Sequence, residues 1–232
     1  ANNIGIQKAL SEGADYVFLL NHDAYLEQAC IEKMIDVHQN NPEYGVLSPI
    51  HLNGNGTNLD YNFNEYIKRI NNDNLVFDLL NGTPEKVYSL PFVNAAGWLI
   101  PKSTIERVGL FDPMFFHYGE DENYCQRIRY HGLKVGVVPS ACMRHDREGR
   151  VRPNISGKLD IEFLERSLKL YLGDMNIIPD FDAKKRVWRN EIFKSAIKFD
   201  FRTFRINLLK YRTLVSVIPE ILESRERNKV HY

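Results

Sequence analysis

In this chain of 232 residues, three places stand out for side chains that could bind a metal ion or move a proton. Asp23 closely follows the apolar run Tyr16–Leu20, the acids Glu120–Glu122 follow a cluster of aromatic residues, and His145 precedes another aspartate. Carboxylate oxygens suit Mg²⁺ and Mn²⁺, imidazole nitrogen is a further metal ligand, and a carboxylate can also act as a general base. These residue types point to metal-assisted or acid–base chemistry.

The position of Asp23 allows two interpretations. An acid after a buried strand lies at the carboxyl edge of the sheet, where open α/β sheets bind their ligands. An aspartate after a strand is more often the N-cap of a helix, so the residue alone is a weak signal. His145 also follows an expected strand. Together the two residues would form a two-ligand site for a divalent cation, completed by diphosphate oxygens and water.

The acid cluster Glu120–Glu122 also allows two interpretations. A helix N-terminus stabilises negative charge, so these acids could simply cap the helix expected at Asp121–Tyr130. Clustered carboxylates resist simultaneous ionisation and aromatic neighbours desolvate them, so at least one pKa should rise towards the range of a general base. The unusual composition, with four aromatic residues beside three acids, favours the general base.

The elements that must position these residues follow from the hydrophobic pattern. Helical spacing alternates with apolar runs of strand length, which is typical of an α/β fold with a largely parallel sheet. The Asn- and Gly-rich stretch Asn53–Gly82 is expected to form a long excursion. The expected helices are Asn2–Gly13, Leu26–Asn41, Ser103–Val108 with Ser103 as N-cap, and Asp121–Tyr130, and the expected strands are Tyr16–Leu20, Val46–Leu52, Val87–Phe92, Gly97–Pro101 and Val135–Val138.

Charge is divided unevenly along the chain, although its formal net value is +0. Residues 1–150 contain 13 basic and 19 acidic side chains, whereas residues 183–232 contain 13 and 5. The neutral total argues against a generic nucleic-acid-binding protein, which would be basic overall. No apolar run approaches the roughly 20 residues of a membrane-spanning helix. Three cysteines without framework spacing favour a reducing compartment such as the cytoplasm.

From about residue 157 onwards the chain becomes helical and basic. Leu159–Leu172 and Asn190–Arg212 show helical spacing, and the second stretch carries one apolar stripe. The simpler interpretation is that this stripe packs onto the rest of the protein. A basic amphipathic helix also attracts anionic lipid, so a peripheral membrane contact through residues 184–212 is the alternative. The stripe consists of Phe193, Ile197, Phe201, Phe204 and Leu208.

Three motifs occur in a fixed order in residues 1–150. Residues 2–23 contain Asn-Asn-x-Gly-Ile and then Gly-Ala-Asp-Tyr-Val-Phe-Leu-Leu-Asn-x-Asp. Residues 108–121 are Val-Gly-Leu-Phe-Asp-x-x-Phe-Phe-x-Tyr-x-Glu-Asp, and the order continues to Arg127 and His145. Together these motifs resemble family 2 glycosyltransferases, particularly the rhamnosyltransferase-like branch. The resemblance implies a GT-A-like α/β fold, with a mostly parallel mixed sheet flanked by helices and a C-terminal helical extension.

The resemblance also implies roles for individual residues. Asp23 matches the last acid of the Asp-x-Asp-type motif, which contacts the metal and the donor diphosphate, and Asn21 stands at its first acid. Asp121 matches the catalytic base of the Glu-Asp motif, with Glu120 beside it. His145 matches a histidine that completes the coordination of the metal.

Further positions match the family with a supporting role or depart from its pattern. Arg127 matches the arginine after the base and implies structural or electrostatic support. His22 stands where this branch usually has proline, and Asn123 stands where the family often has a second aspartate. The segment that matches the lining of the sugar and acceptor pocket consists of Asn94, Ala95, Ala96, Gly97 and Trp98.

The function implied by the resemblance is inverting transfer of a sugar from a nucleotide-diphospho-sugar to a hydroxyl of a glycan or lipid-linked acceptor. The reaction would use Mg²⁺ or Mn²⁺ held by Asp23 and His145. Residues 1–156 are expected to form a partial catalytic domain without the N-terminal nucleotide-binding portion, followed by a basic helical region at 157–232. The expected location is the cytoplasm, at the inner face of the membrane if the basic region binds lipid.

Two other classes of function compete with this one. The chain could be an inactive fragment, or a relative of the same fold that binds a glycan or a partner without catalysis. Retention of both Asp121 and His145 speaks against a degenerate relative. A nucleotidyltransferase of related fold would need a Gly-rich phosphate loop and a lysine, which are not seen in these residues.

Overall fold

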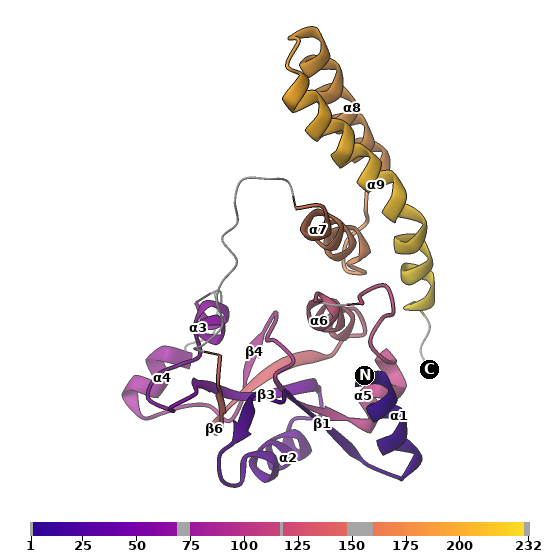
Figure 1. The fold of residues 1–232 in the computed structure, drawn as a ribbon. Coiled ribbons are helices and arrows are strands. Elements are labelled where there is room, and N and C mark those ends of the chain that lie inside the picture. Colours follow the sequence, from indigo (N-terminus) through magenta and orange to yellow (C-terminus); the bar gives the residue numbers. More distant parts are fainter. Residues whose placement is uncertain (1, 69–74, 117, 148–159, 230–232) are drawn as a thin grey trace. The chain divides into compact units, whose positions relative to one another are not determined.

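A computed structural model gives the fold of the chain (Figure 1). The expected boundary between residues 156 and 157 lies outside the described residues, as does the start of the helix expected at Leu159–Leu172. The boundary therefore stays a prediction. The residues that the structure describes are 2–68, 75–116, 118–147 and 160–229.

The chain forms two compact units. Unit 1 comprises residues 1–111 and 124–152 together with the last two residues, and unit 2 comprises residues 112–123 and 153–230. Helix α6 (Glu120–Tyr130) contributes its first residues to unit 2 and the remainder to unit 1.

Unit 1 is built on a mixed sheet with the strand order β1-β5-β3-β6-β2, and β4 pairs with another part of β6. β3 and β6 run parallel, and the other pairs among the described residues are antiparallel. The strands are β1 (Tyr16–Leu20), β2 (Ala24–Leu26), β3 (Tyr44–Asn53), β4 (Tyr88–Leu90), β5 (Gly97–Pro101) and β6 (Lys134–His145).

The expected α/β class, the mixed sheet and the flanking helices are confirmed, but the expected predominance of parallel pairs is wrong. β1 and β5 were the clearest apolar runs, and they pair antiparallel, with Tyr16 opposite Pro101 and Leu20 opposite Gly97. A continuous apolar run indicates that both faces of a strand are covered and does not give its direction. The pattern therefore identified the strands correctly and their pairing incorrectly.

Helices cover both faces of the sheet in unit 1 (Figure 1). On one face, Met34 of α2 packs against Leu47 and Leu99. On the other, α6 contributes Ile128 to the largest cluster of buried side chains, together with residues of α1, α3 and α5. Burial of each such side chain is worth about 1.5–3 kcal/mol. The remaining helices of this unit are α1 (Asn2–Ser11), α2 (Cys30–Asn40), α3 (Tyr61–Ile67), α4 (Leu75–Asn81) and α5 (Lys102–Val108).

The described part of the excursion Asn53–Gly82 contains α3 and α4, and Asp60 caps α3 by accepting a hydrogen bond from the backbone N–H of Phe63 at 3.0 Å. The expected N-cap at Ser103 is wrong. Helix α5 begins one residue before Ser103, after Pro101, and no side chain caps it. Proline is favourable next to a helix start because its φ is already fixed near the helical value.

Unit 2 consists largely of three helices among its described residues, α7 (Ile161–Gly173), α8 (Phe181–Ile197) and α9 (Phe201–Arg227). Each begins after an aspartate whose carboxylate accepts a hydrogen bond from a backbone N–H three residues later, which is the usual N-cap arrangement. Helices α8 and α9 pack side by side as a hairpin (Figure 1). The buried core of the unit consists of Met114, Phe115, Leu168, Leu172, Leu214, Val217 and Ile221.

The single helix expected at Asn190–Arg212 is broken into the end of α8 and the start of α9. Phe199 has a φ of +53°, in the left-handed region that ends a helix, and Asp200 then caps α9. The expected stripe therefore does not lie on one helix face. Within the described residues, no helix combines the length and the apolar character needed to span a bilayer.

Candidate active site

Asp23 and His145 lie next to each other at one end of the sheet. The backbone N–H of Ala24 donates to the carbonyl of Asn21 at 3.0 Å, which forms the tight turn between β1 and β2. β2 then pairs with the end of β6, so that Ala24 lies opposite His145. The Oδ1 atom of Asp23 is consequently 3.3 Å from Nε2 of His145. The structure thus brings together two residues that the sequence analysis predicted as metal ligands.

The surroundings of His145 favour its neutral form. Its side chain is fully buried, and Nε2 accepts a hydrogen bond from Nε of Arg147 at 2.9 Å. Burial and the charge of Arg147 lower the pKa of His145, while the carboxylates of Asp23 and Asp60 act in the opposite direction with less effect. Histidine binds metals as neutral imidazole, and a metal on Nε2 would replace the hydrogen bond from Arg147 because this nitrogen has one lone pair.

Sequence analysis missed two further members of this site, His51 and Asp60. The ring of His51 is fully buried, with its centroid 6.2 Å from that of His145, and its Nε2 lies 2.9 Å from the hydroxyl of Ser48. Burial strongly lowers the pKa of His51. Asp60 caps α3 with one oxygen and places the other 3.9 Å from Nε of Arg147.

We call these five residues the polar cluster: Asp23, His51, Asp60, His145 and Arg147. The signal for His51 was its position near the end of β3, which runs parallel to β6 and ends at the same edge. Residues at the carboxyl ends of parallel strands converge in space. The cluster therefore combines carboxylates, imidazoles and one guanidinium at the edge where α/β proteins bind charged ligands.

The chemistry of Asp23 and His145 fits a divalent cation. Two neighbouring ligands of a six-coordinate ion with bonds of about 2.1 Å lie about 3 Å apart, and the separation of 3.3 Å between Oδ1 and Nε2 is close to this value. Nδ1 of His145 is buried without a hydrogen-bond partner among the described residues. The part of the chain that the structure describes contains no group of three or more aspartate, glutamate, histidine or cysteine side chains that could hold a metal ion. Asp23 and His145 are the two ligands that the sequence analysis expected, and whether they bind a metal stays a prediction.

The segment Asn94–Trp98 lies against the first predicted motif. The backbone N–H of Asn21 donates to the carbonyl of Ala96 at 3.0 Å. Gly97 leaves room for the side chain of Met143, because a Cβ atom there would stand 2.5 Å from its sulfur. Trp98 is fully buried and stacks on Phe111 at a centroid distance of 6.1 Å. Asn94 is largely buried, and its Oδ1 has no hydrogen-bond partner among the described residues. Its role in a sugar pocket stays a prediction.

In unit 2, Glu120 and Asp121 form the start of α6, where the helix N-terminus favours negative charge. Oδ1 of Asp121 accepts a hydrogen bond from the backbone N–H of Glu122 at 2.8 Å. The two preceding residues, Tyr118 and Gly119, both have positive φ, at +65° and +95°. Such backbone conformations are rare for a residue like tyrosine and cluster at functional sites. The turn therefore fixes where the two acids emerge.

Asp112 anchors this turn to the end of α9, a role that the sequence analysis did not predict. One oxygen accepts from the hydroxyl of Ser224 at 2.6 Å and from the amide of Asn228, and the other accepts from Arg227 at 2.6 Å. Burial alone would raise the pKa of Asp112. These hydrogen bonds and one from the backbone N–H of Met114 lower it by more than burial raises it, so the pKa lies below its usual value. The carboxylate therefore stays ionised and holds residues 112–123 against α9.

Arg127 holds the other part of α6 within unit 1. Its buried guanidinium donates to the carbonyl of Leu110 at 2.6 Å and to that of Val108, and it lies 5.5 Å from the ring centroid of Tyr124. These contacts tie α6 to the residues that follow α5. These hydrogen bonds from Arg127 support the position of α6.

The fold and the site together define a class of protein, an α/β protein whose mixed sheet carries clustered ionisable side chains at one edge. Residues 16–214 match the family "Glycosyl transferase family group 2". The match covers most of the chain, and the chain therefore belongs to this family.

Two curated proteins that resemble this chain are also named as sugar transferases. The chain is 30% identical over 139 residues to the low-salt glycan biosynthesis hexosyltransferase Agl10 of Haloferax volcanii, which covers 58% of this chain and 44% of that protein. It is 24% identical over 153 residues to the dTDP-rhamnosyl transferase RfbF of Shigella flexneri, which covers 62% and 47%. The chain thus spans less than half the length of these relatives. A structure of GalNAc-T7 with UDP, GalNAc and Mn²⁺ overlaps 74% of this chain and 37% of its own, with a TM-score of 0.48 and 14% identity.

Proposed function

We propose that this chain carries catalytic residues of an inverting glycosyltransferase that moves a sugar from a nucleotide-diphospho-sugar to a hydroxyl of a glycan or lipid-linked acceptor. The main support is the close pairing of Asp23 with His145 at the sheet edge, in a member of a glycosyltransferase family. We assign the catalytic portion to residues 1–156 and a basic helical region to residues 157–232.

In this reaction the acceptor oxygen attacks the anomeric carbon of the donor sugar as the bond to the nucleoside diphosphate breaks. The carboxylate of Asp121 takes the proton of the acceptor hydroxyl, and Glu120 adds negative charge beside it. Attack from the face opposite the leaving group inverts the configuration at the anomeric carbon. General-base assistance of this kind is worth roughly 10²–10⁴-fold in rate.

The polar cluster has the task of holding the diphosphate end of the donor. Asp23 and His145 would hold Mg²⁺ or Mn²⁺, which supplies positive charge to a departing diphosphate. Asn21 follows β1 directly and is proposed to contact the donor beside Asp23. The segment Asn94–Trp98 is proposed to border the sugar and acceptor, with Asn94 offering the polar group.

The test of the base is Asp121→Asn in the full-length protein, compared with Glu122→Gln as the matched control. Glu122 is an exposed acid in the same helical turn, so it experiences the same helix N-terminus. We expect turnover to fall by about 10²–10⁴-fold in the first variant only, measured as nucleoside diphosphate released. Retained turnover in Asp121→Asn, or an equal loss in Glu122→Gln, would contradict the assignment.

The test of the donor site is calorimetry, which measures how tightly candidate donors bind in the presence of Mn²⁺ or Mg²⁺. The names of the two relatives suggest dTDP-activated rhamnose and nucleotide-activated hexoses as the first donors to try. Asp23→Ala should weaken metal-dependent donor binding, while Asp36→Asn on the exposed face of α2 should not. Tight donor binding without any transfer, in the parent protein and in Asp121→Asn alike, would support a non-catalytic relative instead.

A further inference from the structure

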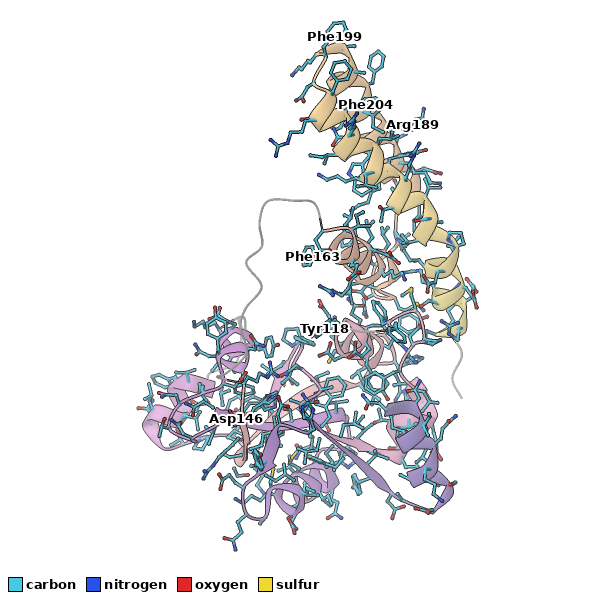
Figure 2. All side chains as sticks on the ribbon, in the orientation of Figure 1. Tyr118, Asp146, Phe163, Arg189, Phe199 and Phe204 are labelled. Carbon is cyan, nitrogen blue, oxygen red and sulfur yellow. The ribbon has the colours of Figure 1, made fainter. Side chains whose placement is uncertain are left out.

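The hairpin of α8 and α9 ends in a group of exposed apolar side chains. Phe193 is 67% exposed, Ile197 61%, Phe199 79% and Phe201 72%. Figure 2 shows Phe199 at the end of the hairpin, with its side chain outside the helix pair. We call these four residues the apolar tip. Contiguous exposed apolar groups of this kind usually mark an interaction surface.

The apolar tip lies within a strongly basic stretch of the sequence. Residues 184–212 contain 10 lysines and arginines and 2 acids. Both acids are engaged inside the hairpin, because Glu191 pairs with Lys194 at 2.7 Å and Asp200 caps α9. Residues 213–232 carry three basic and three acidic side chains, so the excess charge of the C-terminal region belongs to the hairpin. The basic residues closest in sequence to the turn are Lys194, Lys198, Arg202 and Arg205.

The backbone of the turn adds a second, independent observation. Phe199 adopts a φ of +53°, a conformation that glycine or asparagine would adopt with less strain. A phenylalanine there is both strained and 79% exposed, so neither local propensity nor packing favours it. Residues that are unfavourable for the fold and exposed to solvent are best explained by a contact outside the chain.

We infer that the apolar tip docks on an anionic lipid surface, with its aromatic rings in the interfacial region and the surrounding lysines and arginines on the lipid headgroups. Aromatic rings favour the membrane interface, and basic residues are attracted to anionic headgroups. A second copy of this chain is a poor occupant because it would bring two strongly basic hairpins together. The described residues contain no membrane-spanning helix, so this contact is peripheral.

The same unit connects the apolar tip to the acids of the proposed active site. Helix α9 begins at Phe201, a member of the tip, and near its other end Ser224 binds Asp112 at the start of residues 112–123. At 1.5 Å per residue, this stretch of α9 is about 35 Å long. Docking of the tip would therefore fix how far Asp121 stands from the lipid surface.

The experiment is sedimentation of the full chain with vesicles of phosphatidylglycerol mixed with phosphatidylcholine, and with vesicles of phosphatidylcholine alone. We expect the protein to pellet with the anionic vesicles and to be released by salt, because salt screens the headgroup charge. Changing Lys194, Lys198, Arg202 and Arg205 together to Gln should lower the partition coefficient by at least about tenfold. The double change Phe199→Ser and Phe201→Ser should also lower it by at least about tenfold.

Matched controls are available in unit 1. Phe77 and Leu80 of α4 are 66% and 83% exposed, so Phe77→Ser with Leu80→Ser removes comparable apolar surface elsewhere. Changing the exposed Lys8, Lys33, Lys102 and Lys134 to Gln removes the same charge outside the hairpin. Both controls should keep vesicle binding. Circular dichroism of each hairpin variant confirms that α8 and α9 remain helical.

Several outcomes would overturn the inference. One is failure of the parent chain to pellet with anionic vesicles, and another is equal binding to phosphatidylcholine alone. Equal losses in the hairpin variants and the unit 1 controls would show a nonspecific surface effect. A hairpin-dependent dimer in the absence of vesicles, seen by sedimentation equilibrium, would assign the tip to a second copy. These measurements need no sugar transfer, so they stand apart from the test of the proposed activity.

Discussion

The polar cluster of unit 1 and the apolar tip of unit 2 depart from the usual distribution of side chains in opposite directions. The first places carboxylates, imidazoles and a guanidinium among strands, with His51 and His145 almost completely buried. The second leaves phenylalanines more than half exposed. Buried charges and exposed apolar groups both reduce stability, so a fold retains them where function needs them. One region suits a small charged ligand, and the other suits an extended surface.

The two regions also differ in how the chain builds them. Members of the polar cluster come from the β1–β2 turn, β3, the start of α3 and the end of β6, and only the tertiary fold brings them together. Members of the apolar tip lie within nine residues of one another in the sequence, Phe193 to Phe201. Loss of one cluster residue leaves its buried neighbours without a partner, whereas loss of one tip residue leaves the rest of the fold intact.

The largest effect that separates the two regions should come from Asp23→Ala. Removing the proposed metal ligand beside a buried histidine should reduce the proposed sugar transfer by at least about 10³-fold, because the charge of a bound ion would be worth several kcal/mol in the transition state. The same variant should bind anionic vesicles like the parent protein, because Asp23 is remote in sequence from the hairpin and contributes no basic charge. Turnover assays and vesicle sedimentation on one preparation make the comparison. Loss of vesicle binding in Asp23→Ala would break the proposed separation of roles.

A smaller effect should distinguish the apolar tip from the core of its own unit. Leu214 on α9 is fully buried, and Leu214→Ala should lower the free energy of unfolding by about 2–5 kcal/mol. Ile197 is 61% exposed, and Ile197→Ala should change the free energy by no more than about 0.5 kcal/mol. Urea denaturation followed by circular dichroism measures both. A large loss in Ile197→Ala would mean that the tip is part of the folded core.

Sequence patterns predicted two strands of the sheet with their bounds but not how these strands pair. Tyr16–Leu20 and Gly97–Pro101 form strands with the predicted bounds, because short apolar runs between turn residues are a local signal. β2 has three residues and was missed, since it exists through its pairing with β6. The strand predicted at Val135–Val138 extends to His145 for the same reason. Pairing between distant segments leaves no periodic trace in either one.

Residues of the candidate site could be predicted when they belong to a sequence motif. They could not be predicted when only tertiary contacts bring them into the site. Asp23 and His145 were predicted to meet, and they do. In the sequence, His51 is an ordinary residue of an expected strand and Asp112 is one residue of a motif. Their contacts, with His145 and Ser224, come from distant segments and could not be predicted. The break between α8 and α9 did have a local signal in Asp200 followed by Thr203, an N-cap pair inside an apparently continuous helix.

Asp112→Asn should show that a buried charge can be purely structural. Because the folded pKa of Asp112 lies below the unfolded value of about 3.9, its ionised form stabilises the protein above that pH. This contribution is lost as the pH falls through the folded pKa. The variant should lose about 1–3 kcal/mol near neutral pH, because the charged acceptor of Ser224, Arg227 and Asn228 is removed. Because asparagine does not titrate, the variant should also lack the loss of stability that protonation of Asp112 causes at low pH. Urea denaturation between pH 3 and 7 measures both effects, and an unchanged pH dependence would contradict the anchor role.

The smallest effect should come from Phe199→Gly, which tests whether the apolar tip is kept against the preference of the fold. Glycine adopts positive φ without strain but loses more backbone entropy on folding, so the net change in stability should be within about 1 kcal/mol. The side chain of Phe199 is 79% exposed, so its removal opens no cavity in the core. Vesicle binding should fall even though the turn becomes easier to form. A marked loss of stability would instead mean that Phe199 is held by contacts within the hairpin, and the contrast with the polar cluster would then rest on the charges alone.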